Sequence, residues 1–171
     1  VTSDLSKVLP DLEELDLSYN SISGEFVLPK CSSLKHLDVS NNKISSFDAV
    51  GGVCQDFNYM NAAANQLTTV PSVFAPRFYE EKSSLMLYDN QIELDGVIDI
   101  NVDILDLSQN AITSISDFAF SGIYTRSITL ESNQIASISE TAFQNSTHLV
   151  ELILANNQLK SLKPGVFSSN Q

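Results

Sequence analysis

A short pattern recurs along this chain of 171 residues. In LEELDLSYNSI, residues 12–22, aliphatic side chains stand eight, five and three positions before Asn20 and two positions after it. This spacing fits neither the 3.6-residue period of a helix nor a strict period of two, and it predicts a short strand that ends in a turn. Six more segments have the same spacing, and their asparagines complete the series Asn20, Asn42, Asn65, Asn90, Asn110, Asn133 and Asn157. Successive asparagines are 22, 23, 25, 20, 23 and 24 residues apart, which is typical of a solenoid built from short repeats.

The seven copies of LxxLxLxxNxL resemble the leucine-rich-repeat family over essentially the whole chain. Three copies continue with a Phe ten residues after the asparagine (Phe120, Phe143, Phe167), which is similar to the repeats of extracellular receptors and matrix proteins. The first copy continues as ISGEFVLP, which resembles the repeats of plant receptor ectodomains. The resemblance implies an α/β solenoid, a leucine-rich-repeat horseshoe with a parallel concave β-sheet and mostly irregular or 3₁₀ returns on the convex side.

The spacing also predicts which way each side chain points. Side chains alternate between the two faces of a strand, so residues three and five before each asparagine should lie in the core and those two, four and six before it should face outward. The returning segments should supply the rest of the core: Ile115, Phe118, Phe120, Ile138, Phe143, Leu162 and Phe167. Each asparagine amide can satisfy backbone groups at the end of its strand, so we expect the seven to form a structural ladder.

The two cysteines, Cys31 and Cys54, both lie three residues before the first core position of the next copy. Equivalent positions on adjacent rungs are about 5 Å apart, which is within reach of a disulfide. Two buried thiols that fill the core are the alternative. The sequence leaves both alternatives open.

The charge of the chain limits its partners. With 21 acidic and 9 basic residues the net charge is −12, which repels nucleic acid and anionic lipid and favours basic proteins. No run of about 18 apolar residues occurs, so we expect no membrane segment in this chain. We expect one domain over residues 1–171, with about seven repeats. Neither end has a cysteine-rich cap, so we expect a piece of a longer solenoid with further repeats, capping segments or a partner at both ends; a self-sufficient seven-repeat protein is the alternative.

The sequence predicts no catalytic activity for this chain. Its histidines, His36 and His148, should lie on different faces, and no nucleophile, hydrolase or phosphate-binding motif is present. Asp16, Asp38 and Asp106 share one outward position, but they offer too few oxygens for a calcium ion. We therefore expect no enzyme, no cofactor and no metal site.

Outward residues of the sheet contribute little to the fold and are free to bind a partner. On the third to fifth rungs, where the asparagine spacing is longest and shortest, apolar and aromatic side chains come together inside a polar rim, as in protein-binding hot spots. The predicted ligand-binding residues are Tyr59, Asn61, Met86, Tyr88, Ile104 and Asp106.

These observations favour a recognition module that binds a protein or a glycan through its concave face. The family resemblance implies receptors, innate-immune recognition or cell adhesion. Asn145-Ser-Thr is the one acceptor sequence for N-glycosylation, and it favours an extracellular or cell-surface location. The alternative is an intracellular scaffold that wraps a partner protein in the cytoplasm, and free cysteines together with an unmodified Asn145 would favour it.

Overall fold

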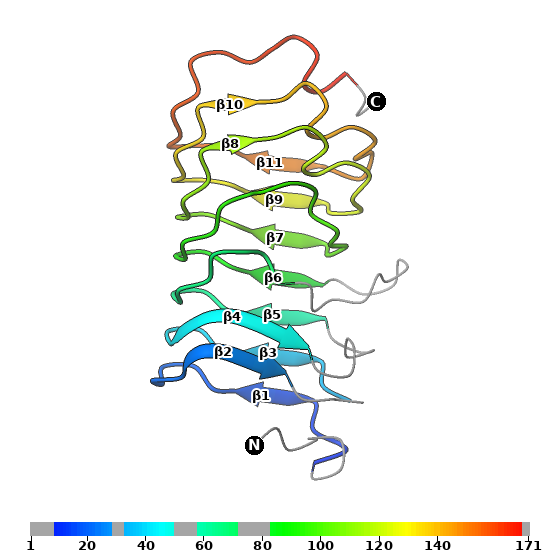
Figure 1. Cartoon of the computed structure of the whole chain (residues 1–171). Coiled ribbons are helices and arrows are strands. Elements are labelled where there is room, and N and C mark those ends of the chain that lie inside the picture. Colours follow the sequence, from blue (N-terminus) through cyan, green and yellow to red (C-terminus); the bar gives the residue numbers. More distant parts are fainter. Residues whose placement is uncertain (1–8, 29–32, 50–57, 72–82, 169–171) are drawn as a thin grey trace.

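The chain folds as a solenoid whose successive turns stack along one axis (Figure 1). The computed structural model describes residues 9–28, 33–49, 58–71 and 83–168. Each turn, here called a rung, consists of one strand and the segment that returns to the start of the next strand. Cys31 and Cys54 lie outside the described residues.

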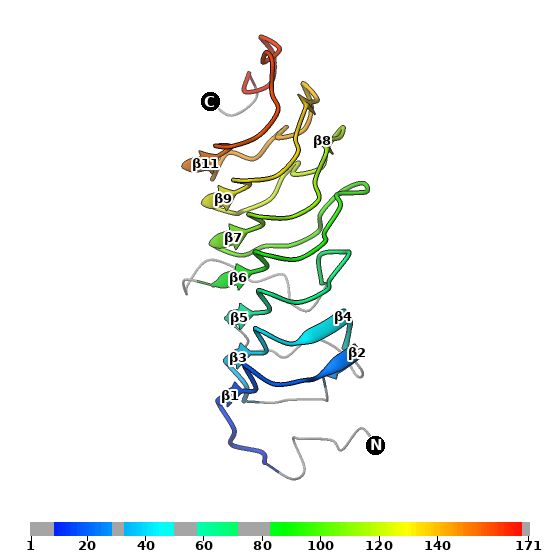
Figure 2. The same ribbon diagram turned by 90° about the vertical axis from the view of Figure 1, so that its left-hand side faces the viewer.

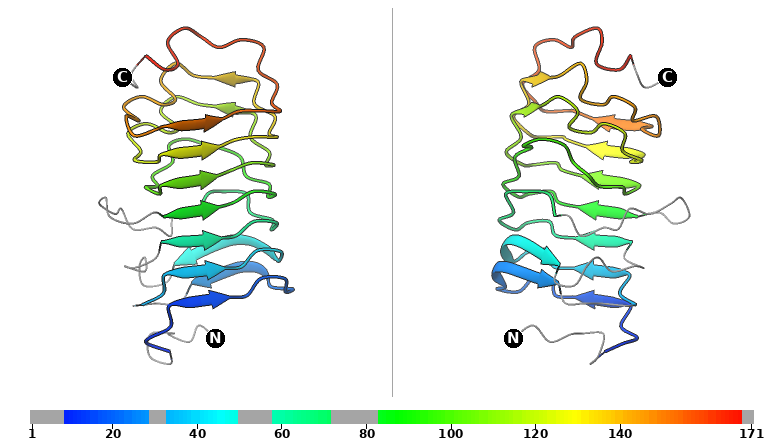
Figure 3. Two further views of the ribbon diagram at one scale, coloured as in Figure 1. Left: turned by 180° about the vertical axis from the view of Figure 1, so that it is seen from behind. Right: turned by 45° about the vertical axis from the view of Figure 1, so that its right-hand side comes forward.

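One parallel sheet of seven strands forms one side of the stack. Its order is β1-β3-β5-β6-β7-β9-β11, so strands that are neighbours in the repeat series are neighbours in the sheet (Figure 3). The strands are β1 (Glu14–Asp16), β3 (His36–Asp38), β5 (Tyr59–Asn61), β6 (Ser84–Met86), β7 (Ile104–Asp106), β9 (Ser127–Thr129) and β11 (Glu151–Ile153). The expected parallel sheet is confirmed, and Figure 2 shows that the stack bends gently toward the sheet side.

The middle residue of each strand points into the core. Leu37, Met60, Leu85, Leu105 and Ile128 are all fully buried, whereas the residues on either side of them are partly or largely exposed. The alternation follows from the pleat of a strand, as the sequence predicted. Burial of each such side chain contributes roughly 1.5–3 kcal/mol, so stacking of the rungs stabilises the fold.

The returns contain short parallel ladders where 3₁₀ pieces were expected. Strand β2 (Ser23–Leu28) pairs with β4 (Lys43–Ala49), and β8 (Ser114–Ile115) pairs with β10 (Ser137–Ile138). The described residues contain strands and turns and no helix of any kind. Many return N–H groups donate to the neighbouring rung, as Lys43 does to the carbonyl of Ile22 at 2.7 Å. Hydrogen bonds to a carbonyl three residues back, such as that from Ser121 to Phe118, form turns. No helix in this part of the chain is long and apolar enough to cross a membrane.

Asparagine side chains connect successive rungs. Asn110 Nδ2 lies 3.0 Å from the carbonyl oxygen of Leu87 on the preceding rung and 3.1 Å from that of Leu107 on its own rung. Its Oδ1 accepts the backbone N–H of Ile92 at 2.9 Å. Asn42, Asn65, Asn90, Asn133 and Asn157 make the same set of contacts. Asn20, on the first described rung, contacts only carbonyl groups of its own rung.

Phenylalanines form a second stack on the return side. Phe120 and Phe143 are fully buried, and their rings lie parallel with centroids 5.4 Å apart. Phe167 continues the stack at 6.0 Å from Phe143. The prediction that Phe118 lies in the core was wrong, because its backbone adopts a left-handed conformation (φ 60°) that turns this side chain outward, and it is 44% exposed. The prediction was also wrong for Leu162 (50% exposed) and Phe167 (44% exposed), because no further described rung covers the last return.

Candidate functional site

The six predicted ligand-binding residues lie on three neighbouring strands. Tyr59 and Asn61 begin and end β5, Met86 ends β6 with Tyr88 two residues later, and Ile104 and Asp106 begin and end β7. Each belongs to the outward set, because the residue between them on each strand is fully buried. Ile104 is 37% exposed, and the other five are partly buried. We call these six residues the central patch.

Strand register aligns the outward residues in columns that run along the stack. Tyr59 lies opposite Ser84, which lies opposite Ile104. The second column contains Asp38, Asn61, Met86 and Asp106 on successive strands. Since parallel strands lie about 4.8 Å apart, neighbours in a column are close enough to contact the same ligand.

Acidic and amide side chains at the strand ends also stabilise the fold. Oδ1 of Asp106 accepts the backbone N–H of Ser108 at 2.9 Å, and Oδ1 of Asn61 accepts that of Ala63 at 3.1 Å. Asp16 and Asp38 cap the backbone in the same way. These local hydrogen bonds are Asx-turns, and an Asp or Asn at the end of a strand is the sequence signal that could have predicted them. Both Asn61 and Asp106 therefore have a structural contact in addition to any contact with a ligand.

Tyr59 sits in a polar environment on this face. Burial raises the pKa of its phenol, and the Asp38 carboxylate and the Tyr88 phenol raise it further. The hydroxyl group therefore remains protonated and is available as a hydrogen-bond donor. On the other side of Tyr59, the ring of His36 packs edge-on with centroids 5.9 Å apart, and His36 Nδ1 is 3.1 Å from a carboxylate oxygen of Glu14.

The sheet face has acidic residues on five of its seven rungs. At the positions two, four and six before each asparagine there is no Lys or Arg, and the acidic residues are Glu14, Asp16, Asp38, Asp106, Glu131 and Glu151. Hydrogen bonds from the side chain and backbone of Ser18 lower the pKa of Asp16, which keeps that carboxylate ionised. Two basic residues stand beside the face, at the start of their strands, and each faces a carboxylate: Lys35 lies 2.9 Å from Glu13, and Arg126 lies 3.5 Å from Asp103.

A cluster of hydroxyl groups surrounds Asp117 on the return side. The Asp117 carboxylate accepts hydrogen bonds from the hydroxyls of Ser139 and Thr141, and these bonds lower the pKa of Asp117. The carboxylate therefore stays ionised and holds two rungs together. Among the described residues, no group of three or more His, Cys, Asp or Glu side chains is placed to hold a metal ion.

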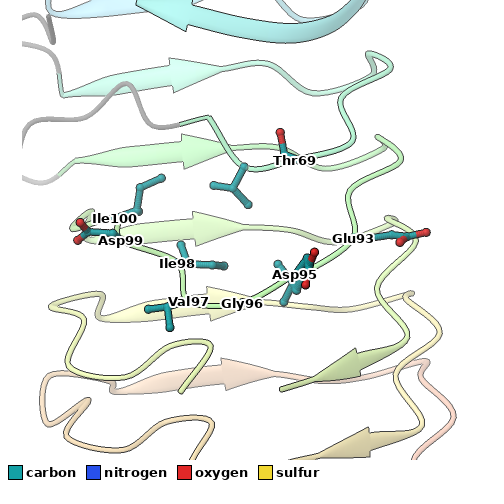
Figure 4. A pocket seen from close by; sticks show the side chains of 10 residues that line it. Thr69, Glu93, Asp95, Gly96, Val97, Ile98, Asp99 and Ile100 are labelled. Carbon is teal, nitrogen blue, oxygen red and sulfur yellow. The ribbon is translucent and has the colours of Figure 1, made fainter. Parts of the chain in front are cut away.

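A shallow cavity of about 150 Å³ lies on the return side, away from the central patch (Figure 4). Its lining comes from residues 93–100 of the fourth return and from Thr69 and Val70 of the third return. Apolar side chains such as Leu94 and Ile98 form its wall, and exposed carboxylates, including Asp95, surround it. None of the predicted ligand-binding residues lines this cavity.

The glycosylation acceptor lies in a turn on the return side. Asn145 is exposed and has a left-handed backbone conformation (φ 61°), and Thr147 is also exposed. Ser146 between them is buried, and its hydroxyl donates to the carbonyl of Phe120. An attached glycan would therefore project away from the sheet face.

Two family models match parts of the chain. The model described as "Leucine Rich repeats (2 copies)" matches residues 3–52, and the model described as "Leucine rich repeat" matches residues 124–170. Among solved structures, a leucine-rich repeat protein from Bacteroides eggerthii superimposes with a TM-score of 0.67 over 86% of this chain and 28% of that one. The sequence identity is 23%, so this likeness concerns the fold alone.

Curated relatives match over nearly the full chain. "Leucine-rich repeats and immunoglobulin-like domains protein 3" from Homo sapiens is 26% identical over 98% of the chain, and "Adenylate cyclase" from Schizosaccharomyces pombe is 28% identical over 92% of it. The chain spans only 13% and 10% of the length of these relatives. The match therefore concerns a repeat segment within much longer proteins.

Proposed function

The chain belongs to the leucine-rich-repeat family, whose members generally bind protein partners, and from this premise we propose that it is a non-enzymatic recognition module that binds a basic protein through its sheet face. The central patch would supply the apolar contacts. The adenylate cyclase relative does not argue for catalysis here, because the matched segment is a tenth of that protein.

One observation carries this proposal. The outward positions of seven consecutive rungs include six acidic residues and no Lys or Arg, and the central patch lies among them. A single-sign surface around partly buried tyrosines and a methionine provides long-range attraction for a cationic partner and apolar anchoring after contact. A glycan ligand is the second candidate for the same face, supported by the tyrosine rings and by the protonated Tyr59 hydroxyl.

Replacement of both central tyrosines should abolish recognition. A Tyr59→Ala, Tyr88→Ala double variant loses two anchors, and we expect its affinity for a protein captured by the wild type to fall at least tenfold, since central aromatic residues dominate interface energies. The measurement is side-by-side capture by immobilised wild type and variant, followed by titration of the captured protein.

The matched control is Tyr19→Ala. Tyr19 is 82% exposed and lies in the turn after β1, outside the three outward positions of its rung. We expect this variant to bind as the wild type does, with both proteins showing the same thermal unfolding. Equal capture by the double variant and the wild type would overturn the proposal, and so would a loss confined to Tyr19→Ala.

We also propose an extracellular or cell-surface location, in a receptor, adhesion or innate-immune protein. The exposed acceptor Asn145 supports it, because the return side leaves room for a glycan. The native protein should then migrate faster on a gel after glycosidase treatment, and an Asn145→Gln variant should show no shift. No shift for either protein would favour the alternative, an intracellular scaffold that uses the same face.

A further inference from the structure

We propose that the sheet face selects an extended segment of its partner that carries two Lys or Arg residues four positions apart, with a large apolar residue midway between them. This inference rests on the proposed function, because it specifies what the same face recognises. It follows from the positions of two carboxylates and of the central patch.

Asp38 and Asp106 belong to one column of the sheet and are separated by three strand-to-strand steps, through Asn61 and Met86. At about 4.8 Å a step, the two carboxylates are about 14 Å apart. An extended chain rises about 3.4 Å per residue and directs every second side chain to the same side. Residues i and i+4 of a segment that runs along the stack therefore reach both carboxylates from one side.

The residue at position i+2 then falls between β5 and β6. Three residues of the central patch face outward from these two strands: Tyr59 at the start of β5, Met86 at the end of β6 and Tyr88 just after β6. Tyr59 lies opposite Ser84 in the sheet register, one strand away from Met86, and Tyr88 follows Met86 by two residues on the same face. Two aromatic rings and a flexible thioether provide a suitable apolar surface for the large side chain at position i+2.

Both carboxylates have free capacity for a cation. Asp106 uses Oδ1 for the backbone N–H of Ser108, and its Oδ2 has no hydrogen bond to any described residue. Asp38 accepts from Ser40 and from the side chain of Asn61, but its charge is not neutralised by a Lys or Arg of the sheet face. Two basic residues that stand two positions apart would span only half of the distance between the Asp38 and Asp106 carboxylates. Two basic residues that stand six positions apart would extend past Asp106 to Thr129, which is uncharged.

Selection from a displayed library of random twelve-residue peptides, with the whole chain as bait at low salt, tests the motif. We expect enrichment of sequences of the form basic-x-apolar-x-basic. A synthetic peptide containing Arg-Ser-Leu-Ser-Arg should then bind at least fivefold more tightly than peptides of equal composition in which the arginines stand two or six positions apart.

An Asp106→Asn variant tests whether the Asp106 carboxylate binds one arginine of the peptide. The amide keeps an acceptor for the Ser108 N–H but removes the charge, so the Arg-Ser-Leu-Ser-Arg peptide should bind about fivefold more weakly. Asp48→Asn is the matched control, because Asp48 is exposed on β4 and its removal changes the net charge equally. We expect no change in peptide affinity for this control.

These experiments separate a failure of the motif from a failure of the proposed function. Enrichment of another spacing, no enrichment of basic peptides, or equal losses of peptide affinity in the Asp106→Asn and Asp48→Asn variants would overturn the motif. The protein-capture experiment with the tyrosine variant would still decide the proposed function, because it does not depend on peptide spacing. Retained protein binding without spacing selectivity would therefore reject this inference alone.

Discussion

Asn110→Ala should destabilise the protein by about 3–5 kcal/mol. The asparagine is 8% exposed, and its amide contacts the carbonyls of Leu87, Leu107 and Ser108 while accepting the N–H of Ile92. Alanine leaves these buried backbone groups without partners, at about 1–3 kcal/mol for each group. A loss of this size is a large part of the stability of a typical domain. Urea denaturation followed by circular dichroism measures it.

Asn20→Ala is the control for this effect. Asn20 is exposed and contacts only the carbonyls of Leu17 and Ser18 on its own rung, so water can replace the lost amide. We expect a loss of about 1 kcal/mol or less, in the range of one ordinary hydrogen bond. Similar losses in the two variants would contradict the role of the ladder in joining rungs.

The strand register could be predicted from the sequence because each repeat specifies its own strand. Leu37, Met60 and Leu85 stand five residues before their asparagines, and the structure pairs them as direct neighbours. The pattern works because a strand has a period of two, so one fixed asparagine sets which residues face the core. The same logic placed the central patch on three adjacent strands.

The returns could not be predicted in the same way. Pairing of β2 with β4 depends on the stacking of two rungs, and a local pattern in either return does not reveal it. The two phenylalanines in DFAF, residues 117–120, look equivalent in the sequence, and only the left-handed turn at Phe118 separates the exposed ring from the buried one at Phe120.

Backbone strain was also hidden in the sequence. The residue before every ladder asparagine has φ between 52° and 56°, although the position includes Tyr19, Ala64 and Gln109, which rarely adopt this conformation. The turn out of each strand imposes the conformation, and the amide ladder holds it. Residue preferences indicate it only at Asn41, Asp89 and Asn156, because Asn and Asp adopt this conformation more readily than other residues do.

Phe143→Ala should reduce stability by about 3–5 kcal/mol, the usual cost of removing a buried aromatic ring. Phe143 is fully buried between Phe120, whose ring is parallel at 5.4 Å, and Phe167 at 6.0 Å. Its removal leaves a cavity that three successive rungs share. Because the rungs are held in place by the parallel sheet on the other side, the returns have little freedom to close this cavity.

Phe118→Ala provides a control with the same chemical change on the same side of the molecule. Its ring is 44% exposed and turns away from the core, so we expect a loss below about 1 kcal/mol. Urea denaturation of both variants, with the slope of the transition compared, measures the difference and shows whether the stack still unfolds as one unit. Equal losses would mean that the phenylalanine stack contributes no more than surface packing. A large loss at Phe143 with an unchanged slope would instead show that rungs far from the cavity, including those that carry the central patch, depend on this stack because each rung is stabilised by its neighbours.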